Sequence, residues 1–398
     1  MKILIVGQHY YPDNFKINDI SLQLAALGHS VTMLTGLPDY ATGKVPSGYK
    51  YFRRRTETIN GVLVLRVPVI ARRKGKFMRM LNYASFLVTS QLKAATMSKD
   101  FDVAFSYQTS PITMARAAIT MKRRAKAKLF LYCLDLWPES LKAWDIKEKS
   151  LLFRCMRKYS AKTYRQCDVV GISSLPFKDY LVQNCGVSES RITYLPQHAE
   201  KMQLGKTKKN TGVIDLAFGG NIGSVQDVEC IIRAVSRLRT LSGFHVHIFG
   251  DGSRLAACRA LATKLNVDDK ITFYGRVDKH ALFEQYRKMD AFLLTLKQKG
   301  FIGMTAPTKL QEYMSAGKPI IAAIGGAAAD IIREADCGLV APASNDELLA
   351  ENMADFIENT DKYRVLGENA HRYYEQHFTK EIFMKRLNDI LQTMQSNG

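Results

Sequence analysis

Short apolar runs alternate with helix-like patterns along the whole chain. Apolar strands separated by helices are typical of parallel sheets that helices cover on both faces. The sequence therefore predicts an α/β fold with two Rossmann-like, doubly wound parallel sheets. The expected strands lie at 3–6, 31–35, 63–69, 103–107, 128–134 and 169–173, and then at 214–220, 245–250, 271–275, 291–296, 319–324 and 338–342.

The strand pattern starts over after residue 210, behind a polar stretch, KMQLGKTKKNTG, at 201–212. A chain of 398 residues is long enough for two domains that each bury a core. We expect a first domain at 1–200, a linker at 201–212, a second domain at 213–365, and a helical tail at 366–398 that returns to the first domain.

Open parallel sheets bind ligands beyond the carboxyl ends of their strands, so the loops that follow strands are the candidate ligand-binding segments. One such loop leads into TAPTKLQEYMSAGKPII at 305–321. Leu310, Tyr313 and Met314 have the spacing of an apolar helix face, and Gly317 and Pro319 mark the end of this helix.

Thr308 and Lys309 fall in the first turn of the predicted helix. Free backbone N–H groups and the positive end of the helix dipole favour a phosphate there. Glu312 lies one turn further on the same side, where its carboxylate suits two hydroxyl groups rather than a phosphate. A nucleoside diphosphate has this layout. The alternative is an ordinary surface pair of Lys309 and Glu312.

A glycine-rich segment, Gly219-Gly220-Asn221-Ile222-Gly223, follows the first strand of the second domain. Glycines let a backbone approach a pyrophosphate closely, although a plain strand-to-helix turn would use them too. The sequence has neither a P-loop nor a well-spaced dinucleotide-binding motif, which argues against ATPases and dehydrogenases.

The net charge of +20 is concentrated in the first half of the chain. Residues 1–200 carry 31 Lys and Arg against 14 Asp and Glu, whereas residues 201–398 carry 26 against 23. Such clusters attract a polyanion, either an anionic lipid surface or nucleic acid. No helix-turn-helix or aromatic-interleaved pattern supports nucleic acid. The clusters lie at 53–55, 72–76 (Arg72, Arg73, Lys74, Lys76), 122–128 and 154–158.

Residues 77–97 lie between two of these clusters and have apolar side chains near helical spacing. A basic helix with an apolar face is typical of a membrane-surface element. The alternative is a core helix that covers the sheet.

No apolar run reaches the roughly 18 residues that a membrane-spanning helix needs. The opening MKILIVG is too short and too strand-like for a signal peptide, so we expect a cytoplasmic protein. The seven cysteines are scattered, which indicates reduced thiols rather than disulfides or a zinc site.

Several motifs together resemble the retaining glycosyltransferases of the two-Rossmann-domain (GT-B) type, family 4. The resemblance covers nearly the whole chain and is strongest to the N-acetyl-fucosamine transferases of bacterial O-antigen and capsule clusters. The motifs that carry it are QHYYP at 8–12, IND at 17–19, LGHSV at 27–31, TGLPDY at 35–40 and DLWPES at 135–140.

For the second domain, the resemblance implies that Glu312 binds the ribose and that Thr308 and Lys309 bind the diphosphate. The first glutamate of the family's Glu-x7-Glu pair would fall at 304, where this chain has Met304. An apolar residue there suits a deoxy or acetamido sugar. The Arg and Lys of many relatives are missing from 219–227, so Lys309 must supply the charge, with Lys297, Lys299 or Arg276 in reserve. Gly220 and Asn221 complete the predicted nucleotide-sugar site.

For the first domain, Asp135 falls where many relatives have a histidine near the sugar. It would orient an acceptor or donor hydroxyl, or else simply bond the backbone of its own turn. Asn14 and Lys16, in the loop after the first strand, are expected near a donor or acceptor phosphate. Asp135 and Lys309 are the predicted catalytic residues.

The implied reaction retains the anomeric configuration, uses a UDP-sugar and needs no metal or other cofactor. The implied acceptor is an undecaprenyl-diphosphate-linked saccharide at the inner face of the cytoplasmic membrane, for O-antigen, capsule or exopolysaccharide. Two alternatives remain open, namely a nucleotide-sugar epimerase of the same fold and a non-catalytic basic protein that binds membrane or nucleic acid.

Overall fold

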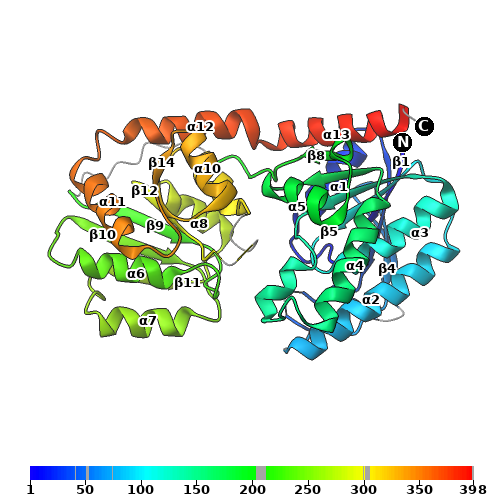
Figure 1. Ribbon diagram of the computed structural model, residues 1–398, viewed down its shortest axis with the longest axis horizontal. Helices are drawn as coiled ribbons and strands as arrows, with labels where there is room; N and C mark the ends of the chain where they lie inside the picture. Colours follow the sequence, from blue (N-terminus) through cyan, green and yellow to red (C-terminus); the bar gives the residue numbers. More distant parts are fainter. Residues whose placement is uncertain are drawn as a thin grey trace. The chain divides into compact units, whose positions relative to one another are not determined.

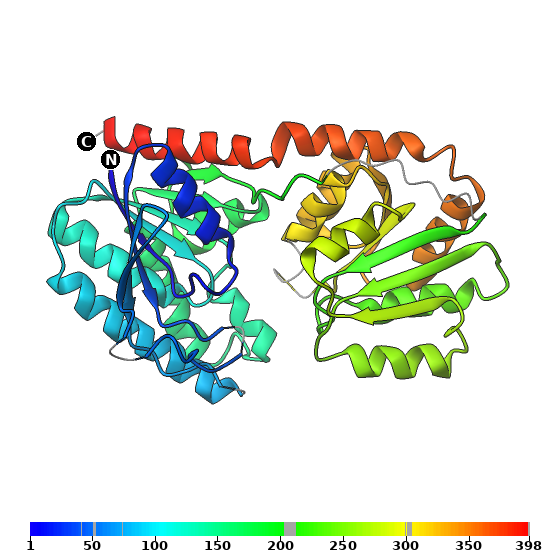
Figure 2. The ribbon, with the colours of Figure 1, turned by 180° about the vertical axis from the view of Figure 1, so that it is seen from behind.

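The computed structural model describes residues 1–40, 42–50, 53–73, 75–202, 212–298, 300 and 305–396. The chain divides into two compact units (Figures 1 and 2). The first unit comprises Met1–Leu195 together with Met384–Gly398, and the second comprises Pro196–Phe383.

The first unit is built on an eight-stranded sheet with the order β3-β4-β2-β1-β5-β6-β7-β8. All neighbouring strands are parallel except β3 and β4, which pair antiparallel at one edge. The strands are β1 (Lys2–Val6), β2 (Ser30–Gly36), β3 (Thr56–Ile59), β4 (Val62–Val67), β5 (Val103–Gln108), β6 (Lys128–Cys133), β7 (Val169–Ile172) and β8 (Ile192–Tyr194).

Helices cover both faces of this sheet. The crossovers β4–β5, β5–β6, β6–β7 and β7–β8 run in the opposite direction to β1–β2, so right-handed connections put α2, α3, α4 and α5 on one face and α1 on the other. The elements are α1 (Lys16–Ala26), α2 (Lys76–Thr96), α3 (Arg116–Ala125), α4 (Leu151–Arg165), α5 (Pro176–Cys185) and three short 3₁₀ turns, η1 (Ile112–Ala115), η2 (Glu139–Trp144) and η3 (Glu189–Arg191).

The second unit has a six-stranded, fully parallel sheet with the order β11-β10-β9-β12-β13-β14. Its strands are β9 (Ile214–Gly219), β10 (Phe244–Phe249), β11 (Ile271–Gly275), β12 (Ala291–Thr295), β13 (Ile320–Ala323) and β14 (Gly338–Ala341). Its helices are α6 (Val228–Arg237), α7 (Leu255–Lys264), α8 (Lys279–Tyr286), α9 (Thr308–Ser315), α10 (Gly326–Glu334), α11 (Asp346–Glu358) and α12 (Arg364–His377).

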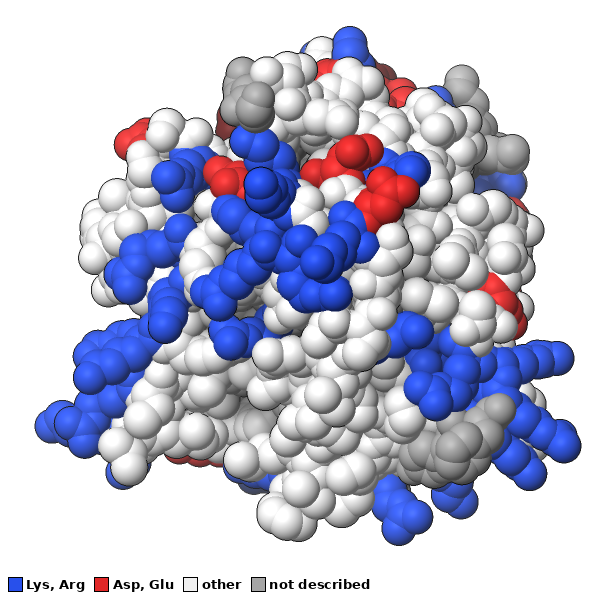
Figure 3. All heavy atoms as spheres, turned by 90° about the vertical axis from the view of Figure 1, so that its right-hand side faces the viewer, with Lys and Arg blue, Asp and Glu red and all other residues white. Residues whose placement is uncertain are grey.

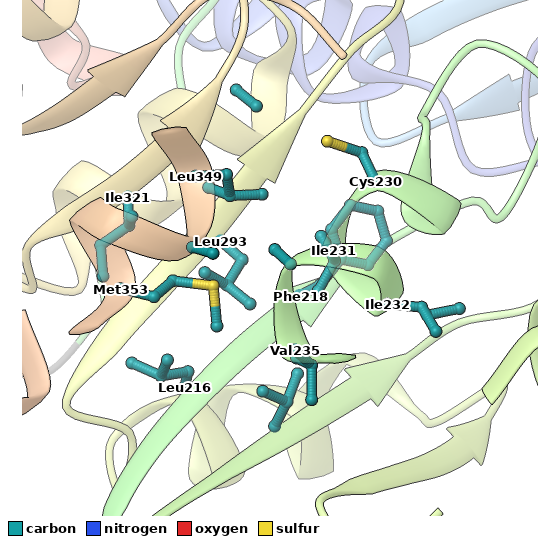
Figure 4. Close-up of a cluster of buried hydrophobic side chains, with 14 of the residues drawn as sticks. Leu216, Phe218, Cys230, Ile231, Ile232, Val235, Leu293, Ile321, Leu349 and Met353 are labelled. Carbon is teal, nitrogen blue, oxygen red and sulfur yellow. The ribbon is translucent and has the colours of Figure 1, made fainter. Parts of the chain in front are cut away.

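A separate buried cluster packs on each face of this second sheet. On one face, side chains of α6 and α11 such as Ile231 and Met353 meet strand residues such as Leu293 (Figure 4). On the other face, the rings of Phe292 and Tyr313 stack with centroids 4.2 Å apart, which fixes α9 against β12. Both clusters are fully buried because parallel strands carry apolar side chains on both faces.

The predicted fold class is confirmed, and each of the twelve predicted strands is present with ends within about two residues of the prediction. Two strands, β3 and the three-residue β8, were missed. β3 alternates between exposed and half-buried positions, so it lacks the apolar run that identified the others. An Asn60-Gly61 turn with positive φ at both residues joins it to β4, and this hairpin signal was available in the sequence.

The predicted helical tail at 366–398 consists of two helices, α12 and α13 (Lys380–Ser396), rather than one. The Thr379 hydroxyl accepts a hydrogen bond from the Ile382 N–H at 3.3 Å and so caps the second helix. The boundary between the units falls inside α13, after Phe383.

The predicted linker at 201–212 lies mostly outside the described residues, and Ala199 and Met202 are buried in the core of the second unit. Among the described residues, no helix is both long enough and apolar enough to cross a bilayer.

Replacing Leu293 by Ala should lower the free energy of unfolding of the second unit by about 2–5 kcal/mol, because the cavity in a fully buried strand cannot collapse. Urea unfolding followed by circular dichroism measures this change. Val365→Ala, at a side chain that is 49 % exposed, is the control and should change stability by no more than about 0.5 kcal/mol. Equal effects of the two substitutions would contradict the assigned core.

Candidate functional site

The loops after β9, β10 and β11 are tied together by backbone hydrogen bonds. The Gly220 N–H donates to the Phe249 carbonyl at 2.9 Å, and the Gly250 N–H donates to the Gly275 carbonyl at 2.7 Å. A Cβ at Gly250 would lie 1.8 Å from the Gly220 carbonyl oxygen, so only glycine permits this approach. The glycine-rich segment is therefore more than a plain turn, because it packs backbone against backbone at the carboxyl edge of the sheet.

These loops enclose a pocket of about 380 Å³ within the second unit. Three of the predicted nucleotide-sugar residues, Gly220, Asn221 and Arg276, line it together although Arg276 is more than fifty residues away in sequence. Asn221 and Arg276 are exposed, and the Asn221 side-chain amide donates a hydrogen bond to the Gln226 side chain at 3.2 Å. The other lining residues are Phe249, Gly250, Asp251, Val277 and Leu282.

Helix α9 begins beside this edge. The strand order reverses between β9 and β12, and the chain that leaves β12 runs into α9, so its first turn starts at the point where such sheets bind ligands. Thr308 is its first residue, after Pro307 in an extended conformation, and no side chain caps it. The Tyr313 hydroxyl accepts a hydrogen bond from the Gly219 N–H at 2.8 Å, which holds the helix against the glycine-rich segment.

Lys309 projects from the first turn of α9 into a largely apolar environment. Its Nζ lies 4.0 Å from the centroid of the Phe218 ring, and a methyl group added at Gly220 would lie 3.0 Å from it. This Nζ is buried and has no hydrogen-bond partner. Burial lowers the pKa of Lys309 to about 8, against an opposing effect of Glu312. A buried ammonium without an acceptor is costly, and an anionic ligand would relieve that cost.

Glu312 is half-buried one helical turn beyond Thr308, as the spacing predicted. Its charge raises the pKa of Lys309, so the two side chains are electrostatically coupled. Lys309 lies next to Gly220 with its Nζ buried, whereas the lysine of an ordinary surface pair would be solvated. Met304 and Lys299 lie outside the described residues.

The reserve cation Lys297 has a different neighbour. Its Nζ lies 3.5 Å from the carboxylate of Asp227, a residue that is almost fully buried in front of α6. Of the reserve cations predicted for the diphosphate, Arg276 therefore lines the pocket, and Lys297 is engaged by Asp227.

In the first unit, Asp135 lies just after β6 and accepts a hydrogen bond from the Ser110 hydroxyl at 2.7 Å. The Trp137 indole N–H donates to the same Ser110 oxygen at 3.0 Å. Burial raises the pKa of Asp135, and the Ser110 hydrogen bond opposes this rise. Ser110 and Asp135 follow neighbouring strands, so the sheet brings two polar side chains together at its carboxyl edge. Ser110 lies in the loop after β5, and the sequence analysis assigned it no role.

The loop after β1 holds the other predicted residues of the first unit. Asn14 is exposed, and Lys16 is the first residue of α1. The same loop carries His9, whose Nδ1 lies 3.8 Å from the Asp39 carboxylate. Burial lowers the pKa of His9 to about 3 and raises that of Asp39 to about 6.

Asp39, to which the sequence analysis assigned no role, has several polar partners. Its Oδ2 accepts hydrogen bonds from the Arg72 N–H at 2.7 Å and from the Asn82 side chain at 2.8 Å. It joins the ends of β2 and β4 to α2. The available signal was its position, since an acidic residue directly after a strand of a parallel sheet lies at the ligand-binding edge.

The four cations predicted to face a membrane have different environments. The Arg72 guanidinium lies over the Tyr40 ring, 4.5 Å from its centroid. Arg73 is exposed, and the exposed Lys76 donates a hydrogen bond to the Trp144 carbonyl at 3.0 Å. Lys74 lies outside the described residues.

Two family models match the chain one after the other. Residues 16–198 match the glycosyl transferase 4-like domain, and residues 200–373 match glycosyl transferases group 1. Among curated relatives, the lipopolysaccharide 1,6-galactosyltransferase of Escherichia coli K12 is 32 % identical over 46 % of this chain and 49 % of its own. The chain thus spans about half the length of this relative and of another curated relative that it matches.

Solved structures match over the full chain. Sucrose-phosphate synthase from Thermosynechococcus elongatus has a TM-score of 0.77 at 15 % identity, with 100 % of both chains covered. Anabaena HepE in complex with UDP has a TM-score of 0.72 at 14 % identity, with 99 % of this chain and 100 % of that chain covered. At these identities the likeness concerns the fold, which is the GT-B arrangement of two α/β units. The two family models and this fold agree with the sequence motifs, and the chain belongs to the GT-B glycosyltransferases of the family 4-like type.

Proposed function

We propose that this protein is a retaining glycosyltransferase that moves a sugar from a UDP-sugar to a lipid-diphosphate-linked saccharide in bacterial surface polysaccharide synthesis. The observation that carries the proposal is the buried, unpaired ammonium of Lys309 at the start of α9, beside the glycine-rich segment. A donor diphosphate would supply the missing acceptor.

UDP as the nucleotide is supported by the HepE structure, which was solved with UDP and has the same fold. A lipopolysaccharide or related acceptor is supported by the name of the Escherichia coli relative. An N-acetylated amino or deoxyamino hexose is proposed as the sugar because of the resemblance to N-acetyl-fucosamine transferases and because Met304 replaces a carboxylate.

The chemistry assigned to the second unit is stabilisation of the leaving group. As the C1–O bond of the donor stretches, negative charge grows on the departing diphosphate, and a transferase must stabilise that charge. In this proposal Lys309 and the free N–H groups of Thr308 and its neighbours interact with it. The Glu312 carboxylate holds the ribose hydroxyls, and Arg276 with Asn221 contacts other parts of the donor. No metal is required.

The acceptor hydroxyl then attacks from the face that the diphosphate is leaving, which retains the anomeric configuration. Its proton passes to the departing phosphate. Asp135, held by Ser110, is proposed to orient the hydroxyl as a hydrogen-bond acceptor, and Asn14 and Lys16 are proposed to contact a phosphate. The basic clusters of residues 1–200 would hold the enzyme at the anionic inner face of the cytoplasmic membrane, where such acceptors are presented.

An assay that combines several UDP- and GDP-sugars with a lipid-diphosphate-linked sugar separates this proposal from its alternatives. A transferase forms product only when the acceptor is present. An epimerase would convert the nucleotide sugar without acceptor, and a non-catalytic basic protein would leave it unchanged.

Glu312→Gln should weaken UDP binding by about 10–100-fold, because a charged acceptor for two hydroxyl groups is lost. Isothermal titration calorimetry with UDP measures the change. Glu347→Gln, in the first turn of α11, is the matched control and should bind UDP like the unaltered protein. Full affinity and activity of Glu312→Gln would count decisively against the assigned donor site.

UDP affinity should fall about tenfold between pH 7 and pH 9. In the free protein Lys309 has a pKa of about 8, so it loses its proton over this range, and only the charged form pairs with phosphate. Lys309→Met should bind UDP weakly at both pH values and show a flatter pH profile. A steep profile that persists in Lys309→Met would assign the titration to another group.

Neutralising Arg73 and Lys76 together, as Gln, should release the protein from anionic vesicles at low salt, because each cation near such a surface contributes about 1 kcal/mol. Vesicle co-sedimentation measures this release. Neutralising Arg372 and Lys385 outside the basic clusters is the control. Undiminished binding of the Arg73 and Lys76 variant would remove these residues from the contact.

A further inference from the structure

Helix α2 has an unusual distribution of polar and apolar side chains. Its inward face buries Asn82 and Ser90 together with Tyr83, Phe86 and Ala94. Asn82 is used structurally, since it donates hydrogen bonds to Asp39 at 2.8 Å and to the Ile70 carbonyl at 2.7 Å. The helix therefore covers the sheet, but part of its buried face is polar.

The outward face of α2 is apolar instead. Phe77 is 70 % exposed, Met80 46 %, Val88 55 % and Leu92 63 %. These residues follow one another at intervals of three, eight and four positions, so they form one stripe along a 21-residue helix. The fold makes no use of this stripe, and single exposed apolar residues are common whereas a row of four is not.

The surroundings of the stripe are cationic. Helices α2, α3 and α4 lie on the same face of the sheet, and none of the three contains an Asp or a Glu. Figure 3 shows the side of the first unit on which α2 and α3 lie. Lys and Arg side chains form several groups there, acidic side chains are few, and a broad uncharged surface lies between the groups.

We propose that the outward stripe of α2 inserts into the interfacial layer of an anionic lipid bilayer, with the helix lying parallel to the membrane plane. An apolar face buried at the headgroup boundary and flanked by cations is the arrangement that anionic lipid stabilises. Leu151 and Leu152 at the start of α4, which are 71 % and 41 % exposed, add a second apolar point on the same face of the sheet.

The charge of this face selects the lipid over other partners. A second copy of the chain would bring two cationic faces together, which is unfavourable. Nucleic acid would bind the cations but would leave the apolar stripe in water. The proposed function already has the enzyme at an anionic membrane. The inference deepens it by naming the helix that enters the lipid, and it rests on that function for the biological purpose of the contact.

The test compares Val88→Gln/Leu92→Gln with the unaltered protein in co-sedimentation with vesicles of phosphatidylcholine containing about one third phosphatidylglycerol. Leu27→Gln is the matched control, because Leu27 is a single leucine, 53 % exposed, at the end of α1 on the other face of the sheet. The double variant should bind at least about tenfold more weakly, which corresponds to about 1.4 kcal/mol. The control should bind like the unaltered protein.

Salt separates insertion from simple charge attraction. At about 0.5 M NaCl the attraction between the cations and the anionic lipid is screened. The unaltered protein should then keep some vesicle binding through the apolar stripe, and the double variant should keep none. Unchanged vesicle binding of the double variant would overturn the proposal. So would an effect of the substitutions on self-association or on DNA or RNA binding alone, measured by analytical ultracentrifugation and by filter binding.

A second variant keeps the test independent of any folding defect. Phe77→Trp should show a blue-shifted emission and quenching by brominated lipid when anionic vesicles are added, and the absence of both would contradict insertion.

UDP binding measured on the same preparations distinguishes the proposed membrane surface from the proposed donor site. Retained UDP binding without vesicle contact would refute the surface alone, whereas vesicle contact without UDP binding would refute only the donor site.

Discussion

The donor site proposed in the second unit depends on one cation, Lys309, that is buried in a largely apolar position. The ammonium of Lys309 lies on the ring of Phe218 without a hydrogen-bond acceptor, next to backbone that only glycine permits. Such a group costs free energy unless something anionic completes it. The surrounding structure keeps it there, because the Tyr313 hydroxyl fixes α9 to Gly219 and the Phe292–Tyr313 stack fixes α9 to the sheet. The buried ammonium lowers the local stability, and an anionic ligand would recover this free energy by accepting its hydrogen bonds.

The first unit also buries polar side chains, but here Asp135 and Asp39 have hydrogen-bond partners. Its polar groups gather at the carboxyl edge of the sheet, where Ser110 holds Asp135 and where Asp39 links His9, Arg72 and Asn82. Burial shifts the pKa values of Asp39 and His9 in opposite directions, and both shifts favour the neutral forms. Because these contacts join loops that follow different strands, they fix the shape of the edge.

The two faces of α2 connect this edge to the surface of the molecule. Asn82 serves the Asp39 network inside, while Phe77, Met80, Val88 and Leu92 face outward. Helical spacing alone suggested both a core helix and a membrane-surface helix. The structure shows that one helix covers the sheet and still leaves an apolar stripe outside, so the two interpretations do not exclude each other.

The sequence by itself determined the twelve apolar strands, the two-sheet fold class and the start of α9 at Thr308, because buried parallel strands and helix ends depend on local composition. It missed β3, whose side chains are at most half-buried, the three-residue β8, and the break before α13, although the Asn60-Gly61 turn and Thr379 were signals available in the sequence. Only the tertiary structure decided that Gly220 meets Lys309, that Arg276 lines the pocket while Lys297 pairs with Asp227, and that Ser110 holds Asp135. These contacts join residues far apart in the chain, and their distances follow from strand order and packing, which no local pattern encodes.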